Sequence, residues 1–215
     1  ASYKPEGDGA ASDSRSHSQS HRLLTKELKL FYGLKDGPVA GIIARLSEVK
    51  GHKYLIMAMK SVIEKIPDAQ LLIVGEGKIQ KELESLADKL GIGEKIRFIP
   101  AVSDTSAPLS AMDVFVMPSL QEGLGLSIME AMLSGVPVAA SEVGGIPSLV
   151  KDGITGILVK PEDSDGLALA IIDLLKNKEK AAAMAVAAKE LIIREFSLEK
   201  MVEQTERVYL ECLKD

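Results

Sequence analysis

One stretch of this chain, residues 113–149, restricts its fold more than any other. The apolar run at 114–116 lies between an aspartate and a proline, as is typical of a strand buried in a parallel sheet. A turn rich in glycine follows, then apolar residues at helical spacing over 126–134, and then a second strand that begins at 136–140. The order strand, turn, helix, strand predicts an α/β domain.

The turn at residues 122–125, Glu-Gly-Leu-Gly, is suited to a diphosphate. Gly123 and Gly125 allow the backbone to approach a ligand closely and to adopt a positive φ. The first amides of the following helix have no helical partners and lie at the positive end of its dipole, which favours an anion. We therefore expect the ligand to be bound by Gly123, Leu124, Gly125, Leu126 and Ser127.

Two carboxylates, Glu122 and Glu130, bracket this turn. Their separation in sequence corresponds to about 12 Å along a continuous helix, so one extended ligand could contact both. Carboxylates repel phosphate and accept hydrogen bonds from hydroxyls, which fits a sugar at one end and a ribose at the other. The alternative is a Rossmann-like domain in which both glutamates only cap helices and stay solvated.

The sequence EGLGLSIME, continuing AMLSGVPVAASEVGGIPSLV, resembles the signature of retaining, nucleotide-sugar-dependent glycosyltransferases of the GT-B fold, family 4. The resemblance extends from about Gly37 to the C-terminus. It implies the C-terminal, donor-binding domain of a GT-B enzyme, in which Glu130 accepts the ribose hydroxyls and Glu122 the hydroxyls of the donor sugar. It also implies a nucleoside diphosphate-sugar as substrate, with UDP or GDP as the nucleotide, and neither a further cofactor nor a catalytic metal.

Strands and helices alternate from residue 38 onward. The apolar runs predict strands at 39–43, 70–74, 95–99, 114–116, 136–140 and 156–159. The helical patterns lie at 52–66, 78–90, 106–112, 126–134, 147–150, 164–175, 179–196 and 198–213. Six strands joined by crossover helices predict a Rossmann-like, doubly wound parallel sheet with the strand order 3-2-1-4-5-6.

Two cations, Arg45 and Lys50, follow the first predicted strand. Open α/β sheets bind ligands beyond the carboxyl ends of their strands, so these side chains suit a diphosphate. In the family that the chain resembles, an arginine followed by lysine-glycine contacts the donor diphosphate here, although Ala44 replaces the usual glycine. Surface ion pairing with Glu48 or another carboxylate is the alternative.

Three further turns carry weaker signals. Gly75 begins the Gly-Glu-Gly turn after the second predicted strand, and Ala101 follows the third, where the family's backbone often holds the base. Pro100 removes a donor beside Ala101 and fixes φ, which weakens the case for base recognition there. The Gly144-Gly145 pair resembles the family's loop near the donor sugar, or is only a tight turn.

The chain divides into three predicted segments. Residues 1–37 read as a polar, serine-rich linker or insertion with a lead-in helix at 23–34. Residues 38–197 form the nucleotide-sugar-binding domain. Residues 198–215 form a helix expected to pack toward an N-terminal GT-B domain, which would be supplied in cis or in trans and would hold the acceptor.

The composition limits the partners. A net charge of −5 without a basic cluster argues against nucleic acid. Cys212 is the single cysteine, which excludes an intrachain disulfide and favours a cytoplasmic setting, with contact at the inner membrane surface left open. Two other functions also remain open at this stage: half of a GT-B epimerase or sugar phosphorylase, and a non-catalytic nucleotide-binding module that works with a partner chain.

Overall fold

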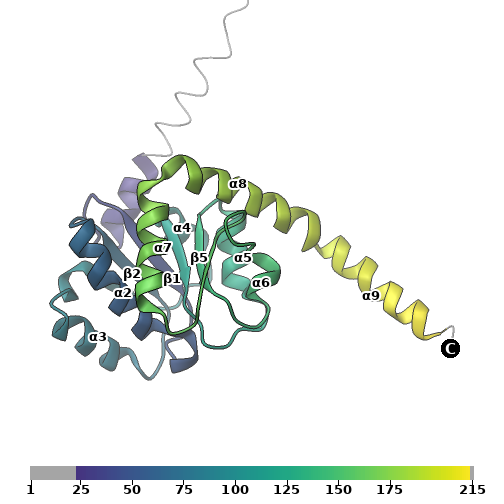
Figure 1. Ribbon diagram of the computed structural model, residues 1–215, viewed down its shortest axis with the longest axis horizontal. Helices are drawn as coiled ribbons and strands as arrows, with labels where there is room; N and C mark the ends of the chain where they lie inside the picture. The colour runs from purple at the N-terminus through teal and green to yellow at the C-terminus, as the bar shows by residue number, and fades with distance from the viewer. Residues whose placement is uncertain (1–22, 214–215) are drawn as a thin grey trace, which may run out of the picture.

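The computed structural model describes residues 23–213 (Figure 1). Its centre is a six-stranded sheet in the order β3-β2-β1-β4-β5-β6, and every neighbouring pair is parallel. The strands are β1 (Val39–Ile43), β2 (Gln70–Val74), β3 (Ile96–Ile99), β4 (Val114–Met117), β5 (Val138–Ser141) and β6 (Ile157–Val159). The predicted fold class and strand order are therefore confirmed.

Helices cover both faces of this sheet, and the last one projects from it (Figure 1). They are α2 (His52–Lys65), α3 (Gln80–Lys89), α4 (Ser106–Ser110), α5 (Leu126–Leu133), α6 (Ile146–Leu149), α7 (Ser164–Lys176), α8 (Lys178–Glu195) and α9 (Leu198–Cys212), with short 3-10 turns η1 (Glu48–Lys50) and η2 (Gly93–Lys95). Helix α2 packs against α3 and α7 in one layer, and α8 packs against α5 and α6 in the other (Figure 1). The central strands β2, β4 and β5 are buried along their whole length because both faces are covered.

From residue 38 onward, every predicted helix and strand ends within two residues of its observed end. The lead-in helix is shorter than predicted: the described residues 23–31 are helical, and Gly33 then adopts a left-handed φ of 70° that ends the helix. The polar segment before residue 23 lies outside the described residues. No helix in the described part of the chain is both long and apolar enough to cross a membrane.

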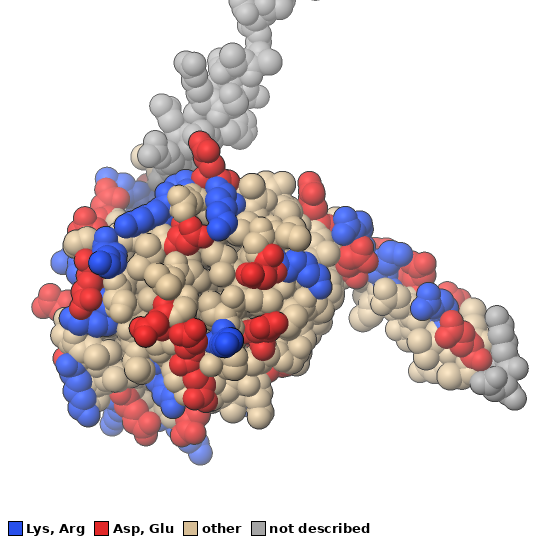
Figure 2. All heavy atoms as spheres, viewed as in Figure 1, with Lys and Arg blue, Asp and Glu red and all other residues tan. Residues whose placement is uncertain are grey.

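Helix α9 projects away from the remainder of the molecule (Figure 1) and has no buried residue. Its charged side chains gather on one side and leave an apolar side opposite, whereas acidic and basic residues are intermixed on the visible face of the main body (Figure 2). The exposed apolar residues of this last segment are Leu198, Met201, Val202, Val208, Tyr209, Leu210 and Leu213. An exposed apolar face on an amphipathic helix is typical of a site that binds another protein segment or domain.

His52 begins α2 directly after the loop that carries Arg45 and Lys50, and its side chain is only 1% exposed. Within residues 23–213 neither ring nitrogen makes a hydrogen bond of good geometry. Burial lowers the pKa of His52 to about 4; the nearby Ser47 backbone opposes this, and the Lys50 charge adds to it. The imidazole is therefore neutral at pH 7.

This burial predicts that the protein loses stability on mild acidification. A histidine in an unfolded chain has a pKa of about 6.5, so between that value and about 4 the unfolded state binds more protons than the folded state. The contribution of His52 is thus complete above the unfolded pKa and is lost as the pH falls toward 4, by up to about 3 kcal/mol. Urea unfolding of wild type and His52→Gln at several pH values across this window measures it. Parallel pH profiles for the two proteins would contradict the prediction.

Candidate functional site

The candidate site is a cavity of about 520 Å³ at the point where the strand order reverses between β1 and β4. Its walls come from the loop after β1 and from the turn between β4 and α5. The lining residues are Ala44, Arg45, Lys50, Glu122, Leu124, Gly125, Leu126 and Ser127. The structure thus brings together seven of the predicted site residues, at the place where doubly wound sheets bind their ligands.

The N-terminus of α5 forms one wall. Gly125 caps the helix with a left-handed φ of 83°, a conformation that glycine adopts without steric cost. No side chain caps this end of α5. Leu126 and Ser127 occupy the first turn, where amides have no helical acceptors, so their N–H groups remain available to an anion.

The two cations that line the cavity, Lys50 and Arg45, differ in their ion pairing. Lys50 donates to the Glu122 carboxylate, with 2.6 Å between Nζ and Oε2, and both side chains are largely buried. Arg45 is exposed and forms no ion pair within residues 23–213. The predicted alternative of ion pairing therefore applies to Lys50, with Glu122 rather than Glu48, and the Arg45 guanidinium is the cation left free to meet a ligand.

The glycine pair after β5 packs against the Glu122 turn. The Gly145 amide donates to the Gly123 carbonyl oxygen at 2.9 Å, and it lies 3.3 Å from the Glu122 carbonyl oxygen. A Cβ atom on Gly144 would clash with that same Glu122 carbonyl, and one on Gly145 with the Gly123 carbonyl. The two glycines therefore permit a close backbone contact that holds the Glu122 turn in place.

Four predicted site residues do not line this cavity. One is Gly123, whose carbonyl oxygen accepts from the Gly145 amide. Glu130 is exposed one turn into α5, and Ala101 is exposed directly after β3. Gly75 has a φ of 145° and packs so closely on the Ala44 carbonyl oxygen that a Cβ atom would clash there. The close packing against the Ala44 backbone therefore explains why residue 75 is a glycine.

Sequence reasoning missed Ser119, whose fully buried hydroxyl lies 3.2 Å from Glu122 Oε2. It lies between the end of β4 and the Glu122 turn. A serine three residues before a glutamate is common, and no local pattern indicates that this hydroxyl turns inward.

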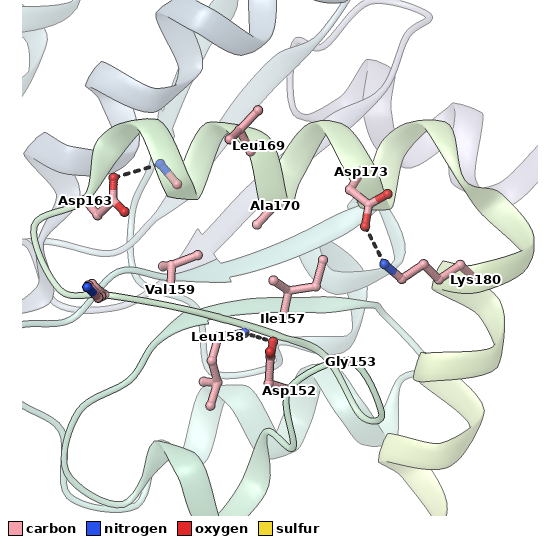
Figure 3. A pocket seen from close by; sticks show the side chains of 12 residues that line it. Asp152, Gly153, Ile157, Leu158, Val159, Asp163, Leu169, Ala170, Asp173 and Lys180 are labelled. Atoms are coloured by element: carbon pink, nitrogen blue, oxygen red, sulfur yellow. Dashed lines mark hydrogen bonds and ion pairs between the residues drawn. The ribbon is translucent and has the colours of Figure 1, made fainter.

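A second cavity, of about 590 Å³, lies between the edge strand β6 and α7 (Figure 3). Its three carboxylates all have partners: Asp152 accepts from the Leu158 amide, Asp163 from the Gly166 amide and Asp173 from Lys180. A diphosphate would meet mainly negative charge here. We therefore place the candidate site at the smaller cavity.

Sequence reasoning also missed one Asp-x-Asp pair, Asp163 and Asp165, at the start of α7. Asp163 is the N-cap of this helix, a common role for aspartate. Among the described residues, no three histidine, cysteine or acidic side chains cluster so as to hold a metal ion. Asp163 thus has a structural role at the helix terminus.

A doubly wound parallel sheet with cations and free helix amides at its switch point defines a nucleotide-binding α/β domain. Residues 26–191 match the family model described as "Glycosyl transferases group 1". The chain belongs to this family, and its fold is that of the C-terminal domain of a GT-B glycosyltransferase.

Two curated bacterial proteins are among the relatives that the chain resembles. It is 38% identical over 167 residues to a GDP-mannose-dependent alpha-(1-6)-phosphatidylinositol monomannoside mannosyltransferase of Mycolicibacterium smegmatis, covering 74% of this chain and 44% of that protein. It is 32% identical over 190 residues to the N-acetyl-alpha-D-glucosaminyl L-malate synthase of Bacillus anthracis, covering 88% and 50%. The chain thus spans about half the length of the curated relatives that it matches.

Two solved structures are similar to this chain in fold. The Anabaena HepE protein in complex with UDP and glucose superposes with a TM-score of 0.81 at 28% identity, covering 88% of this chain and 52% of HepE. The crystallised C-terminal domain of the glycosyl transferase group 1 protein LpcC from Francisella tularensis superposes with a TM-score of 0.74 at 26% identity, covering 81% of this chain and 93% of that domain.

Proposed function

We propose that this chain is the donor-binding half of a retaining glycosyltransferase. It binds a nucleoside diphosphate-sugar, and an N-terminal domain holds the acceptor to which the sugar is transferred. The observation that carries this proposal is the switch-point cavity, where a free guanidinium, a lysine and unpartnered helix amides face one space. The complexes of HepE with UDP and with UDP-glucose support it by analogy.

The geometry suggests how the donor is arranged. Lys50 Nζ lies 2.6 Å from the Glu122 carboxylate, so the cation and the carboxylate occupy one end of the cavity. In a nucleoside diphosphate-sugar the sugar is bonded to the distal phosphate, so a phosphate and sugar hydroxyls must be neighbours. Lys50 would meet that phosphate while Glu122 accepts from the hydroxyls.

The chemical roles follow from charge. Cleaving the bond between sugar and phosphate leaves negative charge on the diphosphate, and Arg45 and Lys50 would stabilise it as the leaving group. The amides at the start of α5 would add their partial positive charge. Glu130 lies farther along α5 and would accept the ribose hydroxyls, which assigns the two glutamates to opposite ends of the donor.

Calorimetry on Glu130→Ala and Glu122→Ala tests this assignment with UDP, UDP-glucose, GDP and GDP-mannose. We expect Glu130→Ala to weaken binding of the bare nucleoside diphosphate by about 1.5–3 kcal/mol, the range for lost hydrogen bonds to a charged group. Glu122→Ala should leave the bare diphosphate nearly unchanged and weaken the nucleotide-sugar. Equal losses for both ligands in both variants would refute the proposed orientation.

We also propose a cytoplasmic setting, because the only cysteine, Cys212, is an exposed free thiol, which suits a reducing compartment. The mycobacterial relatives are named for a phosphatidylinositol mannoside acceptor. A lipid acceptor of that kind would bring the complete enzyme to the inner membrane surface.

A further inference from the structure

We infer that Ser119 is a positioning residue that fixes the orientation of the Glu122 carboxylate toward the donor sugar. The inference rests on the proposed function and adds a determinant of sugar recognition to it. Its basis is the arrangement of donors around the two oxygens of that carboxylate.

Both donors to this carboxylate use the same oxygen. Lys50 Nζ lies 2.6 Å and Ser119 Oγ 3.2 Å from Oε2. Within residues 23–213, no hydrogen bond reaches the other oxygen, Oε1. The carboxylate is therefore anchored through one oxygen, and the other is left to accept from a ligand hydroxyl.

Ser119 is suited to this anchoring because it cannot move toward water. Its side chain is fully buried directly after β4, and a buried hydroxyl requires a hydrogen-bond partner. The neighbouring backbone is also fixed: the Leu120 amide donates to the Val49 carbonyl at 2.7 Å, and Gly145 holds the Glu122 backbone from the other side. The hydroxyl thus approaches Glu122 from a rigid support.

Lys50 alone could not perform this task during donor binding. The same ammonium is required by the diphosphate, and a phosphate draws it away from Glu122. Ser119 carries no charge and is fully buried, so the phosphate does not draw it away. Its hydroxyl continues to donate to Oε2 while Lys50 turns to the ligand. The sugar then meets a carboxylate that is already oriented, which reduces the entropy cost of binding.

The test compares a bare nucleotide with its sugar derivative in Ser119→Ala, using UDP with UDP-glucose and GDP with GDP-mannose. We expect UDP or GDP affinity within about twofold of wild type and nucleotide-sugar affinity lower by about fivefold to tenfold, as for the net loss of one ordinary hydrogen bond. Ser119→Cys has nearly the same size and only a weak donor, so it should show the same selective loss.

The matched control is Thr155→Val, which removes another buried hydroxyl, one that donates to the Leu149 carbonyl at 3.0 Å outside the cavity. It should lower the melting temperature and leave the difference between nucleotide and nucleotide-sugar affinity unchanged. This separates a general loss of stability from an effect on sugar recognition.

A double-mutant cycle decides whether Ser119 acts through Glu122. In a Glu122→Ala background, Ser119→Ala should cause no further loss of nucleotide-sugar affinity. The same loss in both backgrounds, or equal loss of nucleotide and nucleotide-sugar, would overturn the inference while leaving the proposed function intact. A wild-type chain that binds neither pair of ligands would overturn both.

Discussion

The 215-residue chain by itself is expected to bind a nucleoside diphosphate-sugar and to transfer no sugar. Binding is expected because Arg45, Lys50, Glu122 and the first amides of α5 all lie in this half, around one cavity. Transfer requires a second wall that holds the acceptor and excludes water, and such positioning can supply about 7–11 kcal/mol of the barrier reduction. The exposed apolar side of α9 is where we expect that wall to dock.

The test is an assay of labelled-sugar transfer to an acceptor. It compares the chain alone with the chain to which the N-terminal domain is added in trans or joined in cis. Activity should appear only with the second domain. Charged substitutions at Val208 and Tyr209 on α9 should prevent rescue in trans without changing donor affinity, since no residue of α9 lines the cavity. Acceptor glycosylation by the chain alone would show that the second wall is not needed.

Removing either cation that lines the cavity should strongly weaken the binding of a nucleoside diphosphate. Arg45→Ala and Lys50→Ala are each expected to weaken UDP or GDP binding by about tenfold to a hundredfold, and uridine or guanosine binding far less, because only the diphosphate carries charge. Wild-type affinity should also fall as salt rises, since charges at an open cavity are screened over about 8 Å at physiological ionic strength.

Lys50→Ala should weaken binding more than Arg45→Ala, because it also leaves the largely buried Glu122 carboxylate without its cation beside the phosphates. Adding Glu122→Ala to Lys50→Ala should therefore restore part of the UDP affinity. Lys53→Ala removes an exposed lysine outside the cavity lining and serves as the control for net charge. Affinities that do not respond to salt would place the phosphates elsewhere.

The sequence was sufficient for the fold and for the position of the glycine turn before α5. A parallel strand that is buried on both faces has a continuous apolar run, and an amphipathic helix has apolar residues every three or four positions. Both patterns can therefore be recognised from a short stretch of sequence. Alternation of the two types predicts a doubly wound parallel sheet, for which 3-2-1-4-5-6 is a common strand order, and the structure has this order. Gly125 could be assigned to the start of α5 because a left-handed cap favours glycine.

The tertiary structure alone decided how the loops after β1, β4 and β5 meet. Lys50, Glu122 and Gly145 are far apart in sequence, yet an ion pair and a backbone hydrogen bond join them around one turn. Such contacts depend on strand register and loop conformation, which leave no periodic trace in the sequence. For the same reason the Lys50–Glu122 pair and the buried Ser119 hydroxyl became evident only when the three strand ends were placed side by side.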